Sequence, residues 1–208
     1  MSRERELKYA AQSSEPPPLP HGWSLGPERT IAEIVDTYLD HAATLITRGW
    51  ALRRRETVGA PTRYTLKRNA QQVGAFHQRD EIEREGDQIP AEIVHEIGAQ
   101  LASELHEIVT MRQRRRSWPL QLNGSVVADL TTDVIQSGSA QWTELEVEFV
   151  PSVSDADATE MATDLQAFFA GDETLTPSHH SKLEAAIAAL QRGRPVRRAM
   201  MIRRALQQ

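Results

Sequence analysis

The feature that most constrains this chain is an alternation of charged residues, with a period of two, in several predicted strands. Successive side chains of a β-strand point to opposite faces of the sheet, so residues i, i+2 and i+4 share one face. The charged sets are Glu4, Glu6 and Lys8; Arg53 and Arg55; Arg79, Glu81 and Glu83; and Glu144, Glu146 and Glu148. The opposite face of the last segment is apolar, with Leu145, Val147 and Phe149.

Two arrangements explain strands that are charged on one face and apolar on the other. In the common one, the charged face is solvated and the apolar face of the sheet packs against helices. In the other, the sheet closes into a barrel whose charged face points inward, where acidic strands face metal ions and basic strands face an anion. Like charges at i and i+2 repel each other, so their repetition in four segments favours the barrel. The periodicity alone leaves both arrangements open.

Residue patterns predict about eight strands and three helices. The strands are expected at about 3–9, 31–39, 50–56, 63–68, 79–85, 107–117, 121–134 and 142–150. The helices are expected at 90–106, 155–169 and 178–191. The proline-rich stretch within residues 13–29 predicts an extended surface loop. Asn123-Gly124 predicts a tight turn at the start of the 121–134 strand.

Length and composition narrow the functional class. A chain of 208 residues, 39% hydrophobic and 25% charged, suits one globular domain. The net charge of −5 argues against a dedicated nucleic-acid-binding protein, because phosphate backbones attract basic surfaces. The chain has no cysteine, its N-terminus is charged, and it has no apolar run of the roughly 20 residues that a membrane span needs. We therefore expect a cytoplasmic protein with no nucleic-acid or membrane partner.

Eight short motifs, in a consistent order from residue 3 to about residue 191, resemble those of the CYTH domain, or triphosphate tunnel, family. They are Glu4-Arg5-Glu6-Leu7-Lys8, Asp36-Thr37-Tyr38-Leu39-Asp40, Gly49-Trp50-Ala51-Leu52-Arg53-Arg54-Arg55, Tyr64-Thr65-Leu66-Lys67, His77-Gln78-Arg79-Asp80-Glu81, Arg115-Arg116-Ser117-Trp118, Glu144-Leu145-Glu146-Val147-Glu148-Phe149 and Ser181-Lys182. One departure is His41, which stands where the family usually has threonine. The first motif resembles the family's ExExK signature, and the ordered set is more specific than any single match.

The resemblance implies an α+β fold, a closed eight-stranded antiparallel β-barrel (the triphosphate tunnel) with flanking helices. It implies a domain of residues 1–191, followed by a basic tail at 192–208. The tail is expected to be a solvated segment, a docking element for an anion or partner, or the remnant of a lost second domain. The subgroup that the chain resembles most is the bacterial inorganic triphosphatases, whose CYTH domain often precedes a helical CHAD domain. Tunnel enzymes of this kind can be homodimers.

The resemblance also implies roles for individual residues. The catalytic residues are expected to be Glu4, Glu6, Lys8 and Arg55. The phosphate ligands are expected to be Lys8, Arg53, Arg55, Lys67, Arg79, Arg115 and Lys182, and arginine suits this role because its planar fork can hold two oxygens. The ligands of Mg²⁺ or Mn²⁺ are expected to be Glu4, Glu6, Asp133, Glu146 and Glu148, which offer hard oxygen donors. Further tunnel-lining residues are expected to be Glu81, Glu83 and Glu144.

The leading functional hypothesis is the metal-dependent hydrolysis of inorganic triphosphate to phosphate and pyrophosphate. Related proteins instead hydrolyse thiamine triphosphate or nucleoside triphosphates, or cyclise ATP as class IV-type adenylate cyclases, and the sequence separates these activities poorly. A non-catalytic module that binds polyphosphate or another anion is a further alternative. The paired carboxylates argue against this alternative, because they do not help a protein to bind an anion unless a metal ion is also bound. His77, His179 and His180 lack a partnered ligand pattern and are expected to be structural or exposed.

Overall fold

A computed structural model of the protein describes residues 2–29 and 32–192. Its strands are β1 (Ser2–Ala11), β2 (Trp23–Leu25), β3 (Ala32–Asp40), β4 (Ala51–Thr57), β5 (Arg63–Val73), β6 (Phe76–Glu85), β7 (His106–Leu122), β8 (Ser125–Ser137), β9 (Ala140–Phe149) and β10 (Leu175–Pro177). Its helices are α1 (Thr44–Thr47), α2 (Ala91–Ile97), α3 (Ala99–Glu104), α4 (Asp155–Phe169) and α5 (Lys182–Arg192). None of the helices in this part of the chain has the length and apolar character that a membrane span requires.

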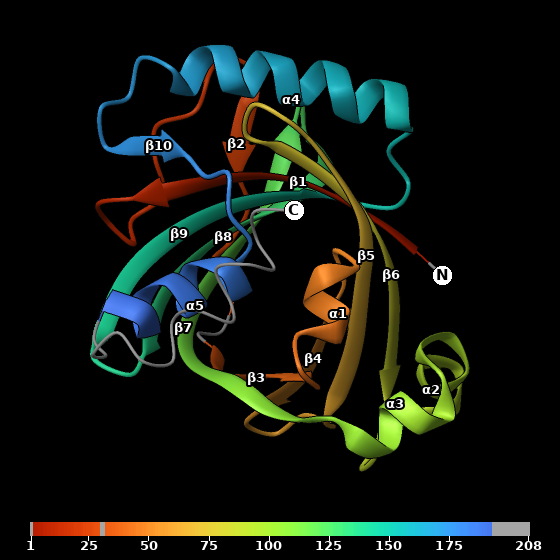
Figure 1. The fold of residues 1–208 in the computed structure, drawn as a ribbon. Coiled ribbons are helices and arrows are strands. Elements are labelled where there is room, and N and C mark those ends of the chain that lie inside the picture. The colour runs from red at the N-terminus through yellow and green to blue at the C-terminus, as the bar shows by residue number, and fades with distance from the viewer. Residues whose placement is uncertain (1, 30–31, 193–208) are drawn as a thin grey trace.

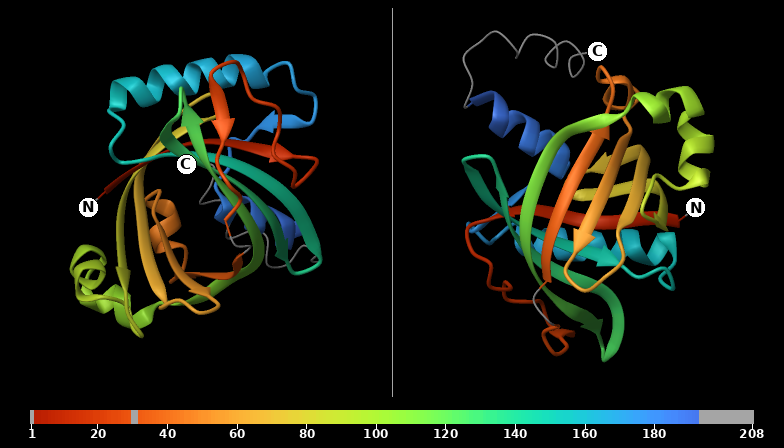
Figure 2. Two further views of the ribbon diagram at one scale, coloured as in Figure 1. Left: turned by 180° about the vertical axis from the view of Figure 1, so that it is seen from behind. Right: turned by 90° about the horizontal axis from the view of Figure 1, so that it is seen from below.

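In the described part of the chain, eight antiparallel strands form a closed ring (Figures 1 and 2). Their order is β1-β6-β5-β4-β3-β7-β8-β9, and β9 pairs again with β1. The short strands β2 and β10 lie outside this ring and pair with β7 and β1. The predicted α+β fold with a closed eight-stranded antiparallel barrel is confirmed. Closure leaves the eight ring strands without a free edge.

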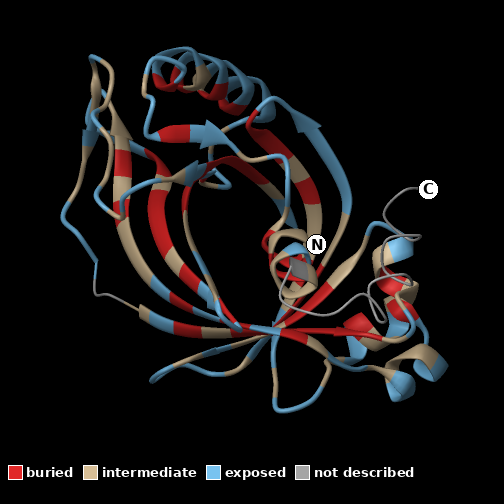
Figure 3. Ribbon diagram, turned by 60° about the vertical axis from the view of Figure 1, so that its left-hand side comes forward, coloured by how far each residue is buried: buried red, intermediate tan, exposed pale blue. Residues whose placement is uncertain are grey.

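The apolar faces of the strands point outward and are covered by helices. Leu7 of β1 and Val147 of β9 pack against Leu165 of α4, and all three are fully buried. On the other side of the ring, α2 and α3 cover β4, β5 and β6, with Leu66 packed in the same cluster as Ile93. Buried segments accordingly alternate with more exposed ones along the strands (Figure 3). The inward-charged arrangement is therefore the one that this sequence adopts.

Helix α5 packs against part of the inner wall. Leu183 and Ile187 of α5 form a buried cluster with Met111 of β7 and Ile135 of β8. Met111 shares the inward face of β7 with Arg115, because the two residues are separated by an even number of positions. The helix thus covers an apolar part of the barrel interior, and its first turn lies beside the charged part.

Several predicted boundaries are wrong, for local reasons. The helix expected at 90–106 is two helices, because Gly98 adopts φ 93° and ψ 137° between α2 and α3. Asn123-Gly124 is the two-residue turn that joins β7 to β8, with φ of 51° and 82°, rather than a turn inside one strand. Helix α5 begins at Lys182 instead of 178. The three-residue strands β2 and β10 were not expected, because segments so short carry no periodic signal.

Candidate functional site

The inward faces of the ring strands surround a cavity of about 360 Å³. Most of the site residues predicted from the sequence line this cavity. They are Glu4, Glu6, Lys8, Arg53, Arg55, Lys67, Arg79, Glu81, Glu83, Arg115, Glu146, Glu148 and Lys182. Two further candidate residues, Asp133 and Glu144, are buried and are not among the residues that line this cavity. Residues from seven strands and the first turn of α5 are thus brought to one enclosed space, although they span most of the sequence.

Strands β1 and β9 form an acidic wall with one lysine in it. Lys8 Nζ lies 3.2 Å from Glu6 Oε1 and 3.0 Å from Glu146 Oε1, and its side chain is buried. Burial by itself lowers the pKa of Lys8, but the charges of Glu6, Glu146 and Glu144 outweigh burial and raise its pKa well above the usual value. Lys8 is therefore a permanent cation within the acidic wall.

Glu148 is the carboxyl group of this wall that lacks a partner. It stands directly opposite Glu6 across the β1–β9 ladder, and paired residues share a face. It has no ion pair among the described residues. Solvent reaches much of this residue, and its side chain lines the cavity, where the surrounding wall reduces the hydration of the carboxyl group. Burial, together with the charges of Glu4, Glu6 and Glu146, raises the pKa of Glu148 to about 7.

Strands β4, β5 and β6 contribute most of the basic residues. Lys67 Nζ lies 2.8 Å from Glu4 Oε1 and 2.7 Å from Glu81 Oε1. Arg79 Nε lies 3.1 Å from Glu4 Oε2, and its Nη2 lies 3.4 Å from Glu6 Oε1. Burial lowers the pKa of Lys67, but Glu4 and Glu81 outweigh it and raise the pKa above its usual value. The basic and acidic walls therefore neutralise each other across the cavity.

Asp36 organises the arginines of β4, a role that the sequence analysis did not assign. Arg55 donates from Nε and Nη2 to the two oxygens of Asp36, at 2.7 Å each. Arg53 Nη1 lies 3.7 Å from Asp36 Oδ2, and Gln113 donates to the same oxygen at 2.5 Å. Asp36 is fully buried. The signal that could have identified Asp36 was its place in the Asp36-to-Asp40 motif, on the same face as Tyr38, and Tyr38 lines the cavity.

Asp133 of β8, which is separated from β3 by β7 alone, plays the same part for two other cations. Arg115 donates to its two oxygens at 2.7 and 2.6 Å, and Lys182 Nζ lies 2.6 Å from Oδ2. Lys182 also lies 3.0 Å from Glu146 Oε2. Burial raises the pKa of Asp133, but Arg115 and Lys182 outweigh burial and lower it below the usual value. Asp133 thus holds two cations at the cavity wall.

Glu144 is buried and shares one face of β9 with Glu146. Its Oε1 accepts a hydrogen bond from Trp142 Nε1 at 2.8 Å, and Lys182 Nζ is 3.9 Å from its Oε2. Burial raises the pKa of Glu144 above the usual value, and the nearby Lys8 and Lys182 only partly oppose this. Glu144 is buried and is not among the residues that line the cavity of about 360 Å³, and its expected role as a tunnel-lining residue stays a prediction.

The carboxylates of β1 and β9 have the donor chemistry that Mg²⁺ or Mn²⁺ prefers. Among the described residues, no group of three or more histidines or carboxylates is arranged to hold a metal ion as it stands. The reason is visible in the ion pairs, because Glu4, Glu6 and Glu146 are each engaged by lysine or arginine. Within residues 2–29 and 32–192, Glu148 is the carboxyl group of this wall that has no ion pair, and it stands opposite Glu6. The donor chemistry of this wall suits a divalent cation, and most of its carboxylates are engaged by lysine or arginine in the structure.

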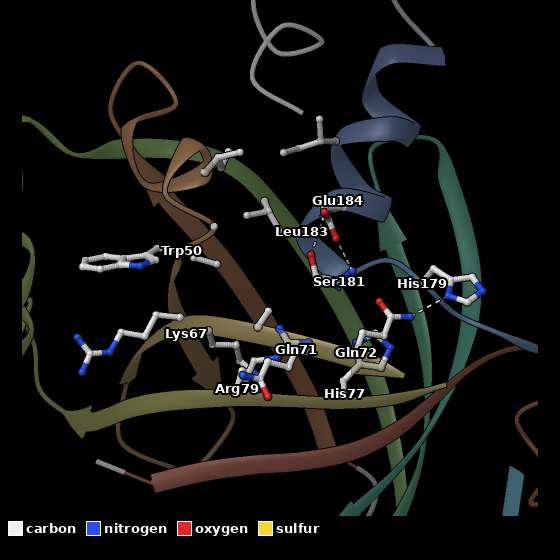
Figure 4. A pocket seen from close by; sticks show the side chains of 16 residues that line it. Trp50, Lys67, Gln71, Gln72, His77, Arg79, His179, Ser181, Leu183 and Glu184 are labelled. Atoms are coloured by element: carbon white, nitrogen blue, oxygen red, sulfur yellow. Dashed lines mark hydrogen bonds between the residues drawn. The ribbon is translucent and has the colours of Figure 1, made fainter. Parts of the chain in front are cut away.

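A second cavity, of about 260 Å³, adjoins the first and shares Lys67 and Arg79 with it. Figure 4 shows Trp50 on one side of this second cavity and His179 on the other, with Gln72, His77 and Arg79 below Ser181. His77 is buried, and burial lowers its pKa. The expectation that His77 is structural therefore agrees with its position, whereas His179 and His180 are exposed.

The model of the CYTH domain family matches residues 2–184. The chain belongs to the CYTH domain family. The closed ring, the charged interior and the order of the strands all lie within the matched region, so the resemblance of the eight motifs is confirmed at the level of the family. No curated protein matches the sequence.

Solved structures agree with this CYTH fold at low sequence identity. The putative adenylyl cyclase HpAC1 from Hippeastrum, which has a dominant triphosphatase activity, superposes with a TM-score of 0.65 at 18% identity, covering 93% of this chain and 98% of that one. PH1819 from Pyrococcus horikoshii gives 0.58 at 18%, covering 92% and 99%. A putative adenylate cyclase from Bacillus halodurans gives 0.53 at 18%, covering 74% and 82%. These likenesses establish the fold of the CYTH chain.

Arg63 also lines the charged cavity of this CYTH fold, and the sequence analysis did not identify it. Its Nη1 lies 3.4 Å from Glu83 Oε1. Its charged face is shared with Thr65 and Lys67 at a period of two, so the alternation used for the other strands would have found it. The basic stretch 193–208 lies outside the described residues, and its expected role stays a prediction. The same holds for the division at residues 191 and 192.

Proposed function

We propose that this CYTH protein hydrolyses inorganic triphosphate to phosphate and pyrophosphate, with Mg²⁺ or Mn²⁺ as cofactor. The observation that carries the proposal is the convergence of lysines, arginines and glutamates from separate strands on one cavity of about 360 Å³. Triphosphate carries four to five negative charges near neutral pH, so its hydrolysis depends mainly on charge neutralisation and alignment. A cavity with both cations and carboxylates supplies partners for the polyanion and for its metal ion.

The cations would bind the phosphate oxygens. Arg53 and Arg55 are held by Asp36, and Arg115 is held by Asp133, so their forks are fixed before the substrate arrives. Side chains that are already ordered lose less conformational entropy on binding. Lys67, Arg79 and Lys182 would complete the set, and Lys8 would contact the phosphate beside the acidic wall. The guanidinium groups stabilise the charge that develops on the equatorial oxygens during phosphoryl transfer.

The carboxylates would hold the divalent cation. Glu4, Glu6, Glu146 and Glu148 are the proposed ligands, all on β1 and β9. When bound there, a divalent cation would neutralise phosphate charge and would lower the pKa of a water molecule. As the phosphate oxygens attract Lys8, Lys67 and Arg79, the glutamates that these cations engage would become free as donors. Asp133 would serve as a positioning residue for Arg115 and Lys182.

The carboxylates favour an enzyme over an anion-binding module. A module that only binds anions would be weakened by an unneutralised Glu148 beside Glu6, whereas a metal-dependent enzyme needs such a pair. HpAC1 supports hydrolysis as the reaction, since a protein of this fold has a dominant triphosphatase activity. The compact charged cavity supports inorganic triphosphate as the substrate, because charged groups line most of its wall.

A substrate panel tests the proposal. The purified chain is incubated with inorganic triphosphate, thiamine triphosphate or ATP, each with Mg²⁺, with Mn²⁺ or with a chelator, and phosphate, pyrophosphate and cyclic AMP are measured. We expect phosphate and pyrophosphate in equal amounts from inorganic triphosphate, only when a divalent cation is present. A higher kcat/KM for thiamine triphosphate or ATP would show that inorganic triphosphate is not the preferred substrate. Formation of cyclic AMP and pyrophosphate from ATP would show that the protein is a cyclase and not a hydrolase. Binding of triphosphate without turnover would show that it is an anion-binding module.

A further inference from the structure

His77 contacts the segment that leads into helix α5. Its Nε2 lies 2.8 Å from the carbonyl oxygen of Ser178, and because a carbonyl can only accept, the ring nitrogen donates. The backbone N–H of Ser178 in turn donates to the carbonyl oxygen of Lys8, at 2.9 Å. Ser178 is therefore fixed from both sides, by a buried side chain of β6 and by the backbone of β1.

A β-bulge aims a second side chain at the same segment. Between Arg68 and Gln71 the β5–β6 register shifts, so Lys67 pairs with Glu81 but Gln72 pairs with His77. The inward residues of β5 are odd-numbered before the bulge, and the extra residue makes Gln72 share the inward face with His77. Gln72 Nε2 lies 2.8 Å from His179 Nδ1, a contact drawn in Figure 4. Two cross-strand neighbours thus hold two consecutive residues of one linker.

The linker ends at Lys182. Ser181 and Glu184 form a capping box, in which Ser181 N donates to Glu184 Oε2 at 2.7 Å and Glu184 N donates to Ser181 Oγ at 3.2 Å. This box fixes the first turn of α5, where the side chain of Lys182 is buried and reaches Asp133 and Glu146. The position of Lys182 in the charged cavity is therefore set by the packing of α5, by the capping box and by the anchorage of residues 178–179.

From this geometry we propose that His77, assisted by Gln72, is a positioning residue that holds the 178–181 linker so that Lys182 reaches the substrate phosphates. This inference rests on the proposed function, in which Lys182 binds phosphate. His77 acts through Lys182 and does not itself contact the substrate, since its donor nitrogen is engaged by Ser178. Loss of the anchor lets the linker shift, and Lys182 then spends less time in the binding position.

A double-mutant cycle with Lys182→Ala tests this role. We expect His77→Leu to raise KM for inorganic triphosphate about fivefold, the effect of one lost hydrogen bond, with a smaller change in kcat. We expect His77→Gln to restore most of the affinity, because its amide can reach the place of Nε2. His77→Asn, whose amide reaches only the place of Nδ1, is not expected to do so. In a Lys182→Ala background, His77→Leu should change KM by less than about 1.5-fold.

The controls separate the possible failures. His180→Leu removes an exposed histidine of the same linker and is expected to leave KM unchanged. Should His77→Leu fail to fold, Gln72→Ala at its exposed position serves instead, with an expected rise in KM of about twofold, again absent in Lys182→Ala. Effects of His77→Leu that multiply with those of Lys182→Ala would overturn the inference. Wild-type kinetics in Lys182→Ala alone would instead contradict the phosphate-binding role assigned to Lys182 under the proposed function.

Discussion

Asp36 and Arg55 form a two-pronged ion pair in the barrel wall, with Nε and Nη2 of Arg55 each 2.7 Å from a carboxylate oxygen of Asp36. Arg53 and Gln113 converge on the same carboxylate. Burial raises the pKa of Asp36, but Arg53 and Arg55 outweigh burial and lower it well below the usual value of 3.8. Asp36 therefore both stabilises the fold and fixes the two arginines that face the cavity.

Asp36→Asn is expected to destabilise the protein at pH 7 by about 3–5 kcal/mol, because it leaves two arginines beside an uncharged partner. A carboxyl group with a lowered pKa stabilises the folded state above its unfolded pKa, and this contribution is lost as the pH falls through the folded value. The difference between wild type and Asp36→Asn should therefore shrink at pH values below about 3.8. Urea denaturation at pH 7 and pH 3 measures it.

The exposed Asp164 on α4 offers the matched control, and Asp164→Asn is expected to change the free energy of unfolding by less than about 0.5 kcal/mol. A destabilisation by Asp36→Asn that stays constant between pH 7 and pH 3 would show that the charge of Asp36 is not its source.

Arg55→Ala is expected to lower kcat/KM for triphosphate by a factor of about 10²–10³, the usual effect of removing one preorganised donor from a developing charge. The neighbouring Arg54→Ala is the control, since Arg54 lies on the opposite face of β4 and pairs with Glu107 at 2.8 Å. Its loss should leave kcat/KM within about twofold. Steady-state kinetics with verified folding by circular dichroism compares the two, and equal effects would mean that the wrong face of β4 has been assigned to the substrate.

Glu6→Gln and Glu148→Gln are each expected to raise the half-activating concentration of Mg²⁺ or Mn²⁺ at least about tenfold, because each removes a charged oxygen donor from the proposed site. The shift of the melting temperature on adding the metal with triphosphate should shrink in the same variants, which gives a readout independent of activity. Glu160→Gln, on the exposed side of α4, serves as the control. An unchanged metal requirement in both variants would remove β1 and β9 from the metal site.

Leu165→Ala is expected to lower the free energy of unfolding by about 2–5 kcal/mol, because Leu165 is fully buried between α4 and the outer face of the barrel. The kinetic constants of the folded fraction should not change, since the substitution is separated from the cavity by the sheet. Thermal unfolding and kinetics below the transition measure both quantities, and a large loss of kcat at full folding would contradict the division into an apolar outside and a reactive inside.

Removal of residues 193–208 is expected to leave kcat and KM for triphosphate unchanged, because the described residues that line the charged cavity already supply its cations and carboxylates, from Glu4 to Lys182. Gel filtration of the shortened chain tests at the same time whether the basic stretch takes part in self-association. A loss of substrate affinity or a change in oligomeric state would instead assign an anion-binding or docking role to this stretch.

Much of the site could be predicted from the sequence, because the period of two in a strand fixes which residues share a face. Glu4, Glu6 and Lys8 line one wall as expected, and so do Arg53 and Arg55. The period does not say which side of the sheet is enclosed. That depended on the ring closing between β1 and β9, a contact between segments more than 130 residues apart along the chain.

Other features escaped the sequence because they depend on three-dimensional partners. Asp36 was visible as part of a motif, but its bidentate contact with Arg55 follows only from the β3–β4 register. Asp133 was predicted from the sequence to be a metal ligand. In the structure its carboxylate contacts Arg115 of β7 and Lys182 of α5, and the sequence alone could not predict these contacts. The bulge in β5 places Gln72 on the inward face, so the inward residues change from odd to even numbers along this strand. The charge pattern around Asn69 and Ala70 does not indicate this change.

The sequence by itself indicated the eight ring strands and the charged face of several of them, since both follow from local alternation along the chain. The tertiary structure alone decided that the charged faces point inward, which cation meets which carboxylate, and which carboxyl group remains unneutralised. These depend on ring closure, strand register and the seating of α5, and they arise from electrostatic contacts between residues that are distant in sequence. Coulomb energy falls with distance in space and not with separation along the chain, so it cannot be read until the fold has brought the charges together.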